Sequence, residues 1–235
     1  FQAARLVAKA IAVRKLLINP KYNLHTTDLA RRAVWEIGAN YQAIAVYDEA
    51  ASWFERFASE SPKDEKAAQA LSDAVVLRLG LGQLEEAIKN SDLFEKQFSN
   101  RAQQAAQIAF AIGAHYADRE DWRNAEKRLS GAMGRIDKNA TADLQLQAHG
   151  LLGRAYNKNG NKNKARQEYD KVRGLWRDPA AAVKKLEELS AAAGEGEAQA
   201  RRRLGKTLEA VGEAYFFSAE EKKAIVDTIA FPEYR

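Results

Sequence analysis

Hydrophobic and polar positions along the chain repeat with the three-to-four-residue period of an α-helix. The alternating runs of Val, Ile and Thr that a half-buried strand needs are missing, and Pro occurs only 4 times in 235 residues. Ala, Leu, Glu, Lys, Gln and Arg dominate, and these residues favour helices. The sequence therefore predicts a nearly all-helical chain, and its 46% hydrophobic residues suffice for a buried core.

One spacing of small and aromatic residues recurs along the chain. A Gly is followed three positions later by Tyr, and eight further residues lead to Ala. The recurrences are Gly38/Tyr41/Ala50, Gly113/Tyr116/Ala125, Gly153/Tyr156/Ala165 and Gly212/Tyr215/Ala224. Residues three or four apart share one face of a helix, so a Gly beside a Tyr lets two helices approach closely while the ring fills the neighbouring space. The spacing predicts units of helix, short turn and helix.

A degenerate unit lies between the first two recurrences. Val75 and Ala87 take its small or apolar positions, and Arg78 replaces the Tyr. In the later units, Asp121 and Asn161 are placed to cap the second helix, since side chains of this type accept hydrogen bonds from the first free backbone amides.

The first unit resembles a complete tetratricopeptide repeat (TPR). The residues that carry the resemblance are Gly38, Tyr41, Ala50, Phe54 and Pro62. It covers most of residues 31–178 and reappears at 205–231, and it implies a right-handed α-solenoid of about five helix-turn-helix repeats. The Ala positions 50, 87, 125 and 165 step by 37, 38 and 40 residues, whereas the family's usual period is 34. We therefore expect longer helices or turns than in standard repeats.

The repeat pattern divides the chain into consecutive parts. They are 1–22, the second helix of a truncated preceding repeat; 31–62, a TPR-like repeat; 68–100, a degenerate TPR-like repeat; 106–137 and 146–178, TPR-like repeats; 179–204, a helix and hinge; and 205–235, a C-terminal TPR-like or capping helix pair. Asn19 and Pro20 are expected to end the first helix, and the residues 194–197 to form a turn rather than a phosphate loop. Because the chain begins with Phe1, we expect a piece of a longer protein.

No motif in the sequence predicts catalysis. There is no Cys, so disulfides and cysteine-ligated metals are excluded, and His25, His115 and His149 lack metal-ligand spacing. His115 and His149 fall on first helices of their repeats and are expected to be structural. We predict a non-enzymatic protein with no cofactor and no metal site.

Nucleic acid is the least favoured partner. The net charge is +5, the sequence pI is about 9.3, and Arg201, Arg202 and Arg203 form a basic run. Successive residues of a helix point about 100° apart, so these three cannot face one phosphate backbone together. The repeated Tyr residues, which could stack on bases, are expected at packing positions instead.

The TPR resemblance implies that the first helix of each repeat lines a concave groove for a protein or peptide partner. Carried over by position, the groove residues are Arg32, Trp35, Gln42, Phe110, Arg154, Asn157 and Lys158. Trp35 and Phe110 would be apolar anchors, and Arg154 with Lys158 would hold a carboxylate. A chaperone-type carboxylate clamp is not expected, because the neighbouring repeat has Ala114 and Ala117 at the corresponding positions.

Two further segments resemble TPR proteins of a bacterial envelope gliding-motility machine. They are residues 71–77 and the C-terminal stretch 212–227 with Phe231 and Tyr234. This resemblance implies a periplasmic or outer-membrane-attached scaffold whose targeting signal precedes Phe1. Phe216, Phe217, Phe231 and Tyr234 are alternatively a capping face or a docking site. The alternative function is a cytoplasmic peptide-binding adaptor or co-chaperone, and the sequence leaves the oligomeric state open.

Overall fold

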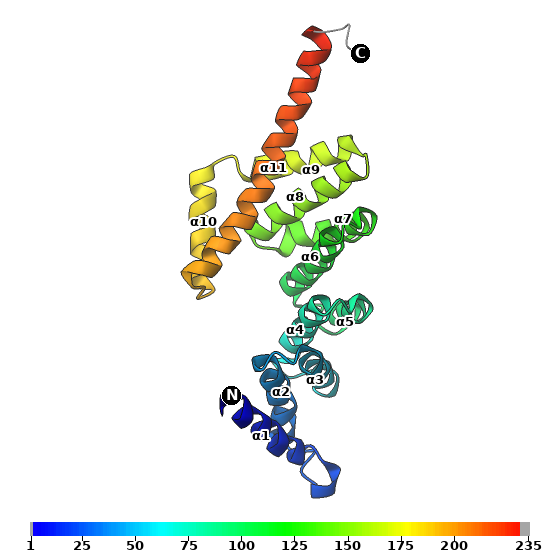
Figure 1. Ribbon diagram of the computed structural model, residues 1–235, viewed down its shortest axis with the longest axis vertical. Helices are drawn as coiled ribbons and strands as arrows, with labels where there is room; N and C mark the ends of the chain where they lie inside the picture. The colour runs from blue at the N-terminus through cyan, green and yellow to red at the C-terminus, as the bar shows by residue number, and fades with distance from the viewer. Residues whose placement is uncertain (1, 231–235) are drawn as a thin grey trace. The chain divides into compact units, whose positions relative to one another are not determined.

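The computed structural model describes residues 2–230, and the side chains of residues 6–224. It forms two compact units, Phe1–Ile108 and Ala109–Arg235, which are described separately. All regular elements of the described residues are helices, and none is a strand (Figure 1). The predicted all-α fold is confirmed.

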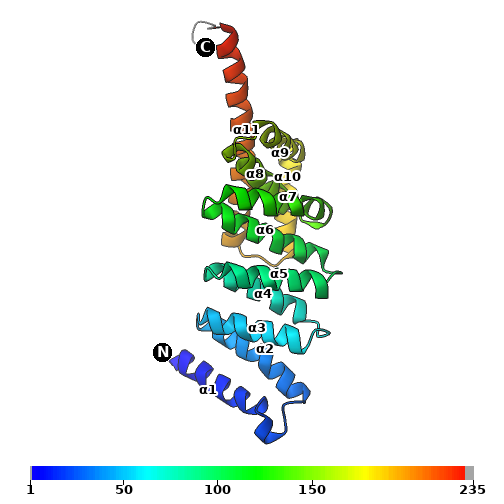
Figure 2. The same ribbon diagram turned by 90° about the vertical axis from the view of Figure 1, so that its right-hand side faces the viewer.

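The first unit is a series of helices joined by short turns (Figure 2). Consecutive helices pack against each other, as α2 does on α3 and α4 on α5. The elements are α1 (Gln2–Leu17), the 3₁₀ helix η1 (Pro20–Tyr22), α2 (Asp28–Ala43), α3 (Tyr47–Glu60), α4 (Ala67–Gly80), α5 (Leu84–Gln97) and the first part of α6 (Ala102–Asp118). Helix α1 ends before Asn19 and Pro20, as the sequence predicts.

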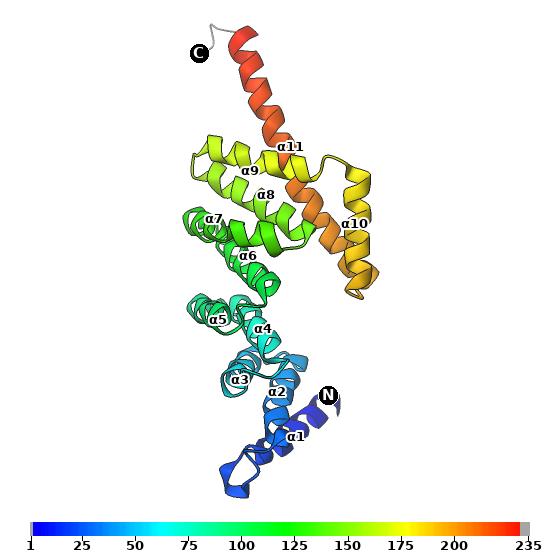
Figure 3. The ribbon, with the colours of Figure 1, turned by 180° about the vertical axis from the view of Figure 1, so that it is seen from behind.

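The second unit continues with two helix pairs and then departs from the repeat pattern (Figure 3). Its elements are the rest of α6, α7 (Trp122–Asn139), α8 (Ala142–Lys158), α9 (Lys162–Leu175), α10 (Pro179–Ala192) and α11 (Glu197–Ala230). Helix α10 is followed by a turn at Gly194, whose φ is 64°, where the sequence predicts a turn. Helix α11 is 34 residues long and packs across α8 and α9.

Glycines in the first helices are the points of closest approach to the second helices. A Cβ atom on Gly38 would lie 2.8 Å from the ring of Phe54, and one on Gly153 would lie 2.8 Å from the ring of Tyr169. On Gly113 it would lie 2.6 Å from Leu129. Real Cβ contacts are not this short, so only glycine fits at these three crossings. Their predicted packing role is confirmed.

Each turn between the helices of a pair contains one residue with a left-handed backbone. These residues are Ala45, Gly82, Glu120 and Gly160, with φ between 58° and 82°. The amide of the next residue donates to a carbonyl five positions earlier, as Asp121 does to Tyr116 at 3.0 Å, which closes the end of the first helix. Asp121 and Asn161 then cap the second helices, with amide to oxygen distances of 3.2 Å in both cases.

The expected helix pair at 205–235 is wrong for the described residues. Helix α11 continues without a turn to Ala230, and a Cβ on Gly212 would meet nothing within 4 Å. Tyr215 is 49% exposed rather than packed. The turn position of the other repeats corresponds to Ala219, where Ala and the following Glu and Lys residues favour continuation of the helix. Phe231 and Tyr234 lie outside the described residues.

Longer helices account for the long period of the later repeats, and the connection of residues 61–66 between α3 and α4 accounts for that of the first. α6 and α8 have 17 residues each and α7 has 18, so a helix pair with its turns exceeds the 34 residues of a standard repeat. The first pair is shorter, with 16 residues in α2 and 14 in α3.

Candidate protein-binding site

In the first unit, Trp35 on α2 packs against two aromatic rings of α3. Its ring is 5.1 Å from the ring of Phe54 and 5.6 Å from that of Phe57, and the ammonium of Lys66 lies 5.3 Å from it. Because Trp35 is only half-buried, part of the indole faces solvent. A pocket of about 400 Å³ opens beside it, lined by Arg31, Arg32, Trp35, Glu36, Phe57, Asp64, Glu65 and Lys66.

The two arginines of this pocket differ in whether an acidic side chain of the chain pairs with them. Arg31 forms ion pairs with Asp28 at 3.2 Å and with Asp64 at 3.4 Å. Arg32 is exposed and forms no ion pair within the described part of the chain. An unpaired guanidinium beside an indole can bind a carboxylate while the ring binds an apolar side chain. Gln42 is exposed at the other end of α2 and does not line the pocket.

Arg78, which replaces the repeated Tyr, is buried between α3 and α4. Only 7% of the residue is exposed, and its Nε and Nη2 donate to the two carboxylate oxygens of Glu55 at 2.8 and 2.9 Å. Nη1 donates to Asp48 at 2.5 Å and to Gln83 at 2.7 Å. The hydrogen bonds to Glu55 raise the pKa of Arg78 most, so its charge is permanent. The network joins the two repeats and leaves Arg78 unavailable to a partner.

Phe110 is half-buried on α6 and belongs to the second unit, whereas Trp35 belongs to the first. The two predicted apolar anchors therefore belong to different units. In the second unit the remaining predicted residues, Arg154, Asn157 and Lys158, lie on α8.

Arg154 contacts the chain's own carboxylates. Its Nε lies 2.9 and 3.0 Å from the two carboxylate oxygens of Glu213, and its Nη2 donates to Glu213 at 2.5 Å and to Glu209 at 3.1 Å. The hydrogen bonds to Glu213 are the main cause that raises the pKa of Arg154. The carboxylate site predicted for a partner is thus occupied by α11.

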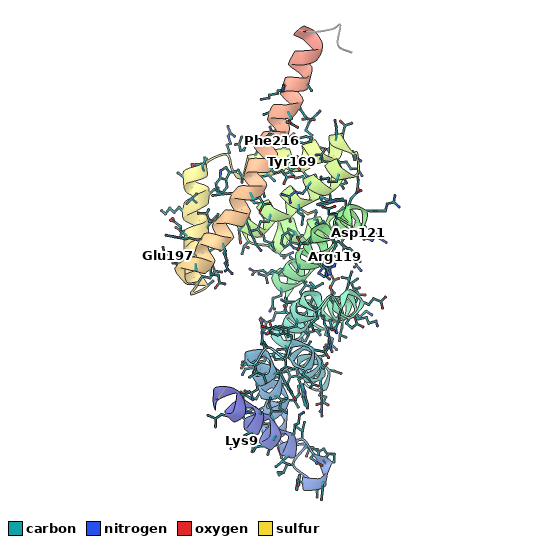
Figure 4. The ribbon with its side chains drawn as sticks, in the orientation of Figure 1. Lys9, Arg119, Asp121, Tyr169, Glu197 and Phe216 are labelled. Atoms are coloured by element: carbon teal, nitrogen blue, oxygen red, sulfur yellow. The ribbon has the colours of Figure 1, made fainter. Side chains whose placement is uncertain are left out.

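The same carboxylate reaches α9. The hydroxyl of Tyr169 donates to Glu213 at 2.7 Å, and the Tyr169 ring lies 4.8 Å from that of Phe217. Burial, followed by the nearby charge of Glu213, raises the pKa of Tyr169. Figure 4 shows Tyr169 close to the path of α11, with Phe216 on the same helix. The repeat spacing of the sequence gives no signal for this contact between residues 44 positions apart.

Helix α11 runs in the same direction as α8. Arg203 faces Asp143 at 3.7 Å, Gln147 donates to Thr207 at 3.3 Å, and Arg154 binds Glu213. Gly150 allows the closest approach, because a Cβ there would lie 2.7 Å from the Cβ of Ala210. Successive first helices of a repeat array also run in one direction, so α11 takes the place of the next first helix.

Asn157 and Lys158 are exposed at the end of α8. The ammonium of Lys158 lies 5.9 Å from the ring of Trp122. Asn157 borders an open pocket of about 520 Å³ between α9 and α11, which is lined by Asn157, Lys162, Arg166, Phe217, Glu220, Glu221, Lys223 and Ala224. Arg154 is not part of this pocket, so the predicted carboxylate pair is not brought together on one free surface.

His149 is buried and joins three helices. Its Nδ1 lies 2.6 Å from Glu168 on α9, and its Nε2 lies 2.8 Å from Asp137 on α7. Burial alone would raise the pKa of Glu168, but hydrogen bonds from His149 and Lys171 outweigh burial and lower it. These contacts agree with the structural role predicted for His149. Among the described residues, no group of three or more His, Cys, Asp or Glu side chains could hold a metal ion.

His115, the other histidine predicted to be structural, is buried on α6. Its Nδ1 lies 3.0 Å from a guanidinium nitrogen of Arg119, one turn later. Burial, followed by the charge of Arg119, lowers the pKa of His115. Figure 4 places Arg119 next to Asp121 at the turn between α6 and α7.

No described helix has the length and hydropathy needed to cross a membrane.

Solved structures of repeat proteins are similar to this chain. RapI in its apo form has a TM-score of 0.54 at 15% identity, covering 94% of this chain and 71% of RapI. A Podosopora anserina protein described as a kinesin light chain with nearly identical TPR-like repeats has a TM-score of 0.53 at 15% identity, covering 77% and 88%. MamA AMB-1 has a TM-score of 0.50 at 12% identity, covering 75% and 86%. No protein-family model and no curated protein sequence matches the chain.

Such low identities bear on the fold alone. They show that the chain has the TPR-like, all-α repeat fold that the sequence predicts. What it binds is a separate question, which depends on the surfaces described above.

Proposed function

We propose that the chain is a non-enzymatic scaffold that binds a segment of another protein through the first helices of its repeats. The observation that supports this most directly is the Trp35 pocket. It combines a partly exposed indole with the unpaired guanidinium of Arg32, which is the combination of anchor and charge found at protein-binding hot spots. The TPR-like fold, which presents such helices in series, is consistent with this function.

The chemistry of the pocket defines the partner. The indole of Trp35 and the ring of Phe57 suit a large apolar side chain, and Arg32 suits a carboxylate within one or two residues of it. We therefore propose an acidic peptide segment with an aromatic or aliphatic anchor. Phe110 on α6 is half-buried and is a second candidate anchor, in the other unit.

Nucleic acid is not supported as a partner. Two of the three residues of the basic run are paired within the chain, since Arg201 binds Glu197 at 2.6 Å and Arg203 contacts Asp143 at 3.7 Å. A phosphate backbone would have to compete with these carboxylates.

The experiment is a selection of displayed peptides on the full chain. We expect the enriched peptides to contain acidic and large apolar residues, and Trp35→Ala to weaken their binding by about tenfold or more, which corresponds to about 1.4 kcal/mol. Trp53→Ala is the matched control, because Trp53 lies on α3 and does not line the pocket. If both variants bind the peptides equally well, the pocket is not the binding site.

We further propose a place in a bacterial envelope motility complex, in the periplasm or attached to the outer membrane. This rests on the resemblance of residues 71–77 and 212–227 and on the absence of any catalytic motif in the sequence. Fractionation of cells that express the natural gene tests it. Recovery with cytoplasmic proteins would instead favour an adaptor or co-chaperone.

A further inference from the structure

One face of α11 is apolar and open to solvent. It carries Gly205, Leu208, Gly212, Tyr215 and Ala219, which alternate at spacings of three and four residues and are all exposed. Leu208 is 45% and Tyr215 49% exposed, and Phe216, which borders this stripe, is 64% exposed. The stripe lies on the side of the helix opposite Ala210 and Ala214, which are buried against the rest of the second unit.

The other first helices have this face covered. Leu208, Gly212 and Tyr215 correspond in spacing to His149, Gly153 and Tyr156 of α8. On α8 the glycine receives the ring of Tyr169 from the antiparallel helix α9, whereas a Cβ on Gly212 of α11 would meet no other described part of the chain within 4 Å. Helix α11 is thus a first helix whose second helix is missing from the described residues.

The order of sizes along the stripe is self-complementary. Small residues at 205, 212 and 219 alternate with Leu208 and Tyr215, so the spacing is that of the two core positions of a heptad. When two such helices run antiparallel, the core position that holds the small residues on one helix faces the core position that holds Leu208 and Tyr215 on the other. Gly212 then faces Tyr215 of the opposite helix, and Ala219 faces Leu208. Every layer joins a small residue to a large one, which lets the backbones approach and fills the space between them.

We propose that this stripe binds the α11 helix of a second copy of the chain, in an antiparallel pair with two-fold symmetry. Each copy places its α11 on the Gly212 face of the other, as α9 lies on the Gly153 face of α8. The contact is isologous, because the same residues form both sides of it. A partner that binds mainly through charge, such as a nucleic acid or an acidic or basic protein, is not indicated, because none of the five residues of the stripe is charged.

The size of the contact sets its strength. Residues 205–219 make about 22 Å of helix. A contact between two helices of this length buries less than the roughly 1,200 Å² of a standard stable interface. We therefore expect a reversible dimer with a dissociation constant on the order of micromolar. Lys222 and Lys223 of one copy would lie within about one turn of Arg201 and Arg202 of the other, so salt should strengthen the dimer by screening this repulsion.

Sedimentation velocity of the full chain over about 1–200 µM measures the dimer in the concentration range that this affinity requires. We expect a shift from monomer to dimer that moves to lower concentration at high salt. Gly212→Leu should raise the dissociation constant by about tenfold or more, because the added side chain fills the space of the facing Tyr215. The monomer should stay folded, since this position is open and Leu favours helix more than Gly.

Disulfide crosslinking tests the register, because the sequence contains no cysteine. Leu208→Cys and Ala219→Cys chains are prepared separately and mixed. We expect crosslinks between the two kinds of chain and few within either kind. Lys206→Cys is the control, since Lys206 is exposed on α11 but lies off the stripe. A chain that stays monomeric at all concentrations and salts, or crosslinks mainly between identical chains, overturns the proposal. Recovery of a different protein's helix on a monomeric chain overturns it as well.

Discussion

Arg154 on α8 binds the carboxylate of Glu213 on α11 through two of its nitrogens, at distances of 2.5–3.0 Å. The carboxylate also accepts a hydrogen bond from the hydroxyl of Tyr169, so one acidic side chain connects α8, α9 and α11. The side chains of Arg154 and Glu213 are 32% and 24% exposed, which shields the pair partly from solvent. Bidentate ion pairs that are partly shielded from solvent contribute more to stability than ion pairs on the exposed surface.

Arg154→Gln should loosen α11 from the second unit. We expect the free energy of unfolding to fall by about 1–2 kcal/mol, because hydrogen bonds to a charged group are lost and, of the described residues, Glu213 keeps only Tyr169 as a partner. Urea unfolding measures the loss, and hydrogen exchange of the α11 amides localises it. Arg166→Gln is the control, since Arg166 pairs with Glu221 at a more exposed site. A larger loss in the control than in Arg154→Gln would contradict this assignment.

Gly113→Leu should force α6 and α7 apart. A Cβ atom alone would lie 2.6 Å from Leu129, so the larger side chain overpacks the crossing and destabilises the chain by about 1–3 kcal/mol. Thermal denaturation measures the effect. Gly131→Leu on α7 is the matched control, because its Cβ would meet nothing within 4 Å. An unchanged melting temperature for Gly113→Leu would mean that the third repeat is aligned incorrectly.

The helix pairs could be predicted because their signals are local. Gly38, Gly113 and Gly153 each act on a side chain 16 residues later, within one repeat, and the spacing of the sequence records this directly. Gly212 carries the same signal, yet α11 continues as one helix. The missing element there is a turn, since Ala219 and the Glu and Lys residues after it favour a helix over a turn. The helix preference of these residues therefore determines whether a turn forms at Ala219, which the repeat spacing alone does not predict.

The candidate site was predictable only in part. The position of Trp35 follows from the repeat pattern, and its half-exposed ring lies on a pocket. The role of Arg154 depends on Glu213, 59 residues away and beyond an inserted helix, α10. No sequence period relates two such residues when a segment between them breaks the repeat. Contacts of this kind need the three-dimensional arrangement of the chain.

Glu168 should make stability depend on pH in the acid range. It faces His149 and Lys171, and His149 in turn faces Asp137. Because the pKa of Glu168 is lower in the folded chain than its ordinary value of 4.5, the ionised carboxylate stabilises the fold above that pH. The stabilisation is lost as the pH falls through the folded pKa.

Urea unfolding between about pH 3 and 7 measures this dependence. Glu168→Gln removes the titrating group, so we expect the unfolding midpoint to change less across the acid range than in the natural chain. Glu187→Gln on α10 is the control, because Glu187 is exposed. If the two variants lose stability in acid to the same extent, the contacts of Glu168 are not the source of the effect.

Arg78 gives the last prediction, because it is a charged residue at a position where the other repeats have Tyr. Arg78→Leu removes the cation but leaves Glu55 and Asp48 with their negative charges, of which Glu55 is 27% exposed. Removing one partner of a buried ion pair costs about 3–5 kcal/mol, and the partial exposure of Glu55 places the expected loss at about 2–4 kcal/mol. Chemical denaturation measures it.

A second substitution separates charge from packing at this site. Glu55→Leu in the Arg78→Leu background removes the unpaired carboxylate, so we expect it to restore part of the lost stability. Asn90 would then lose its 2.7 Å hydrogen bond to Glu55, which limits the recovery. If the double variant is less stable than Arg78→Leu alone, the carboxylate contributes through Asn90 more than through Arg78.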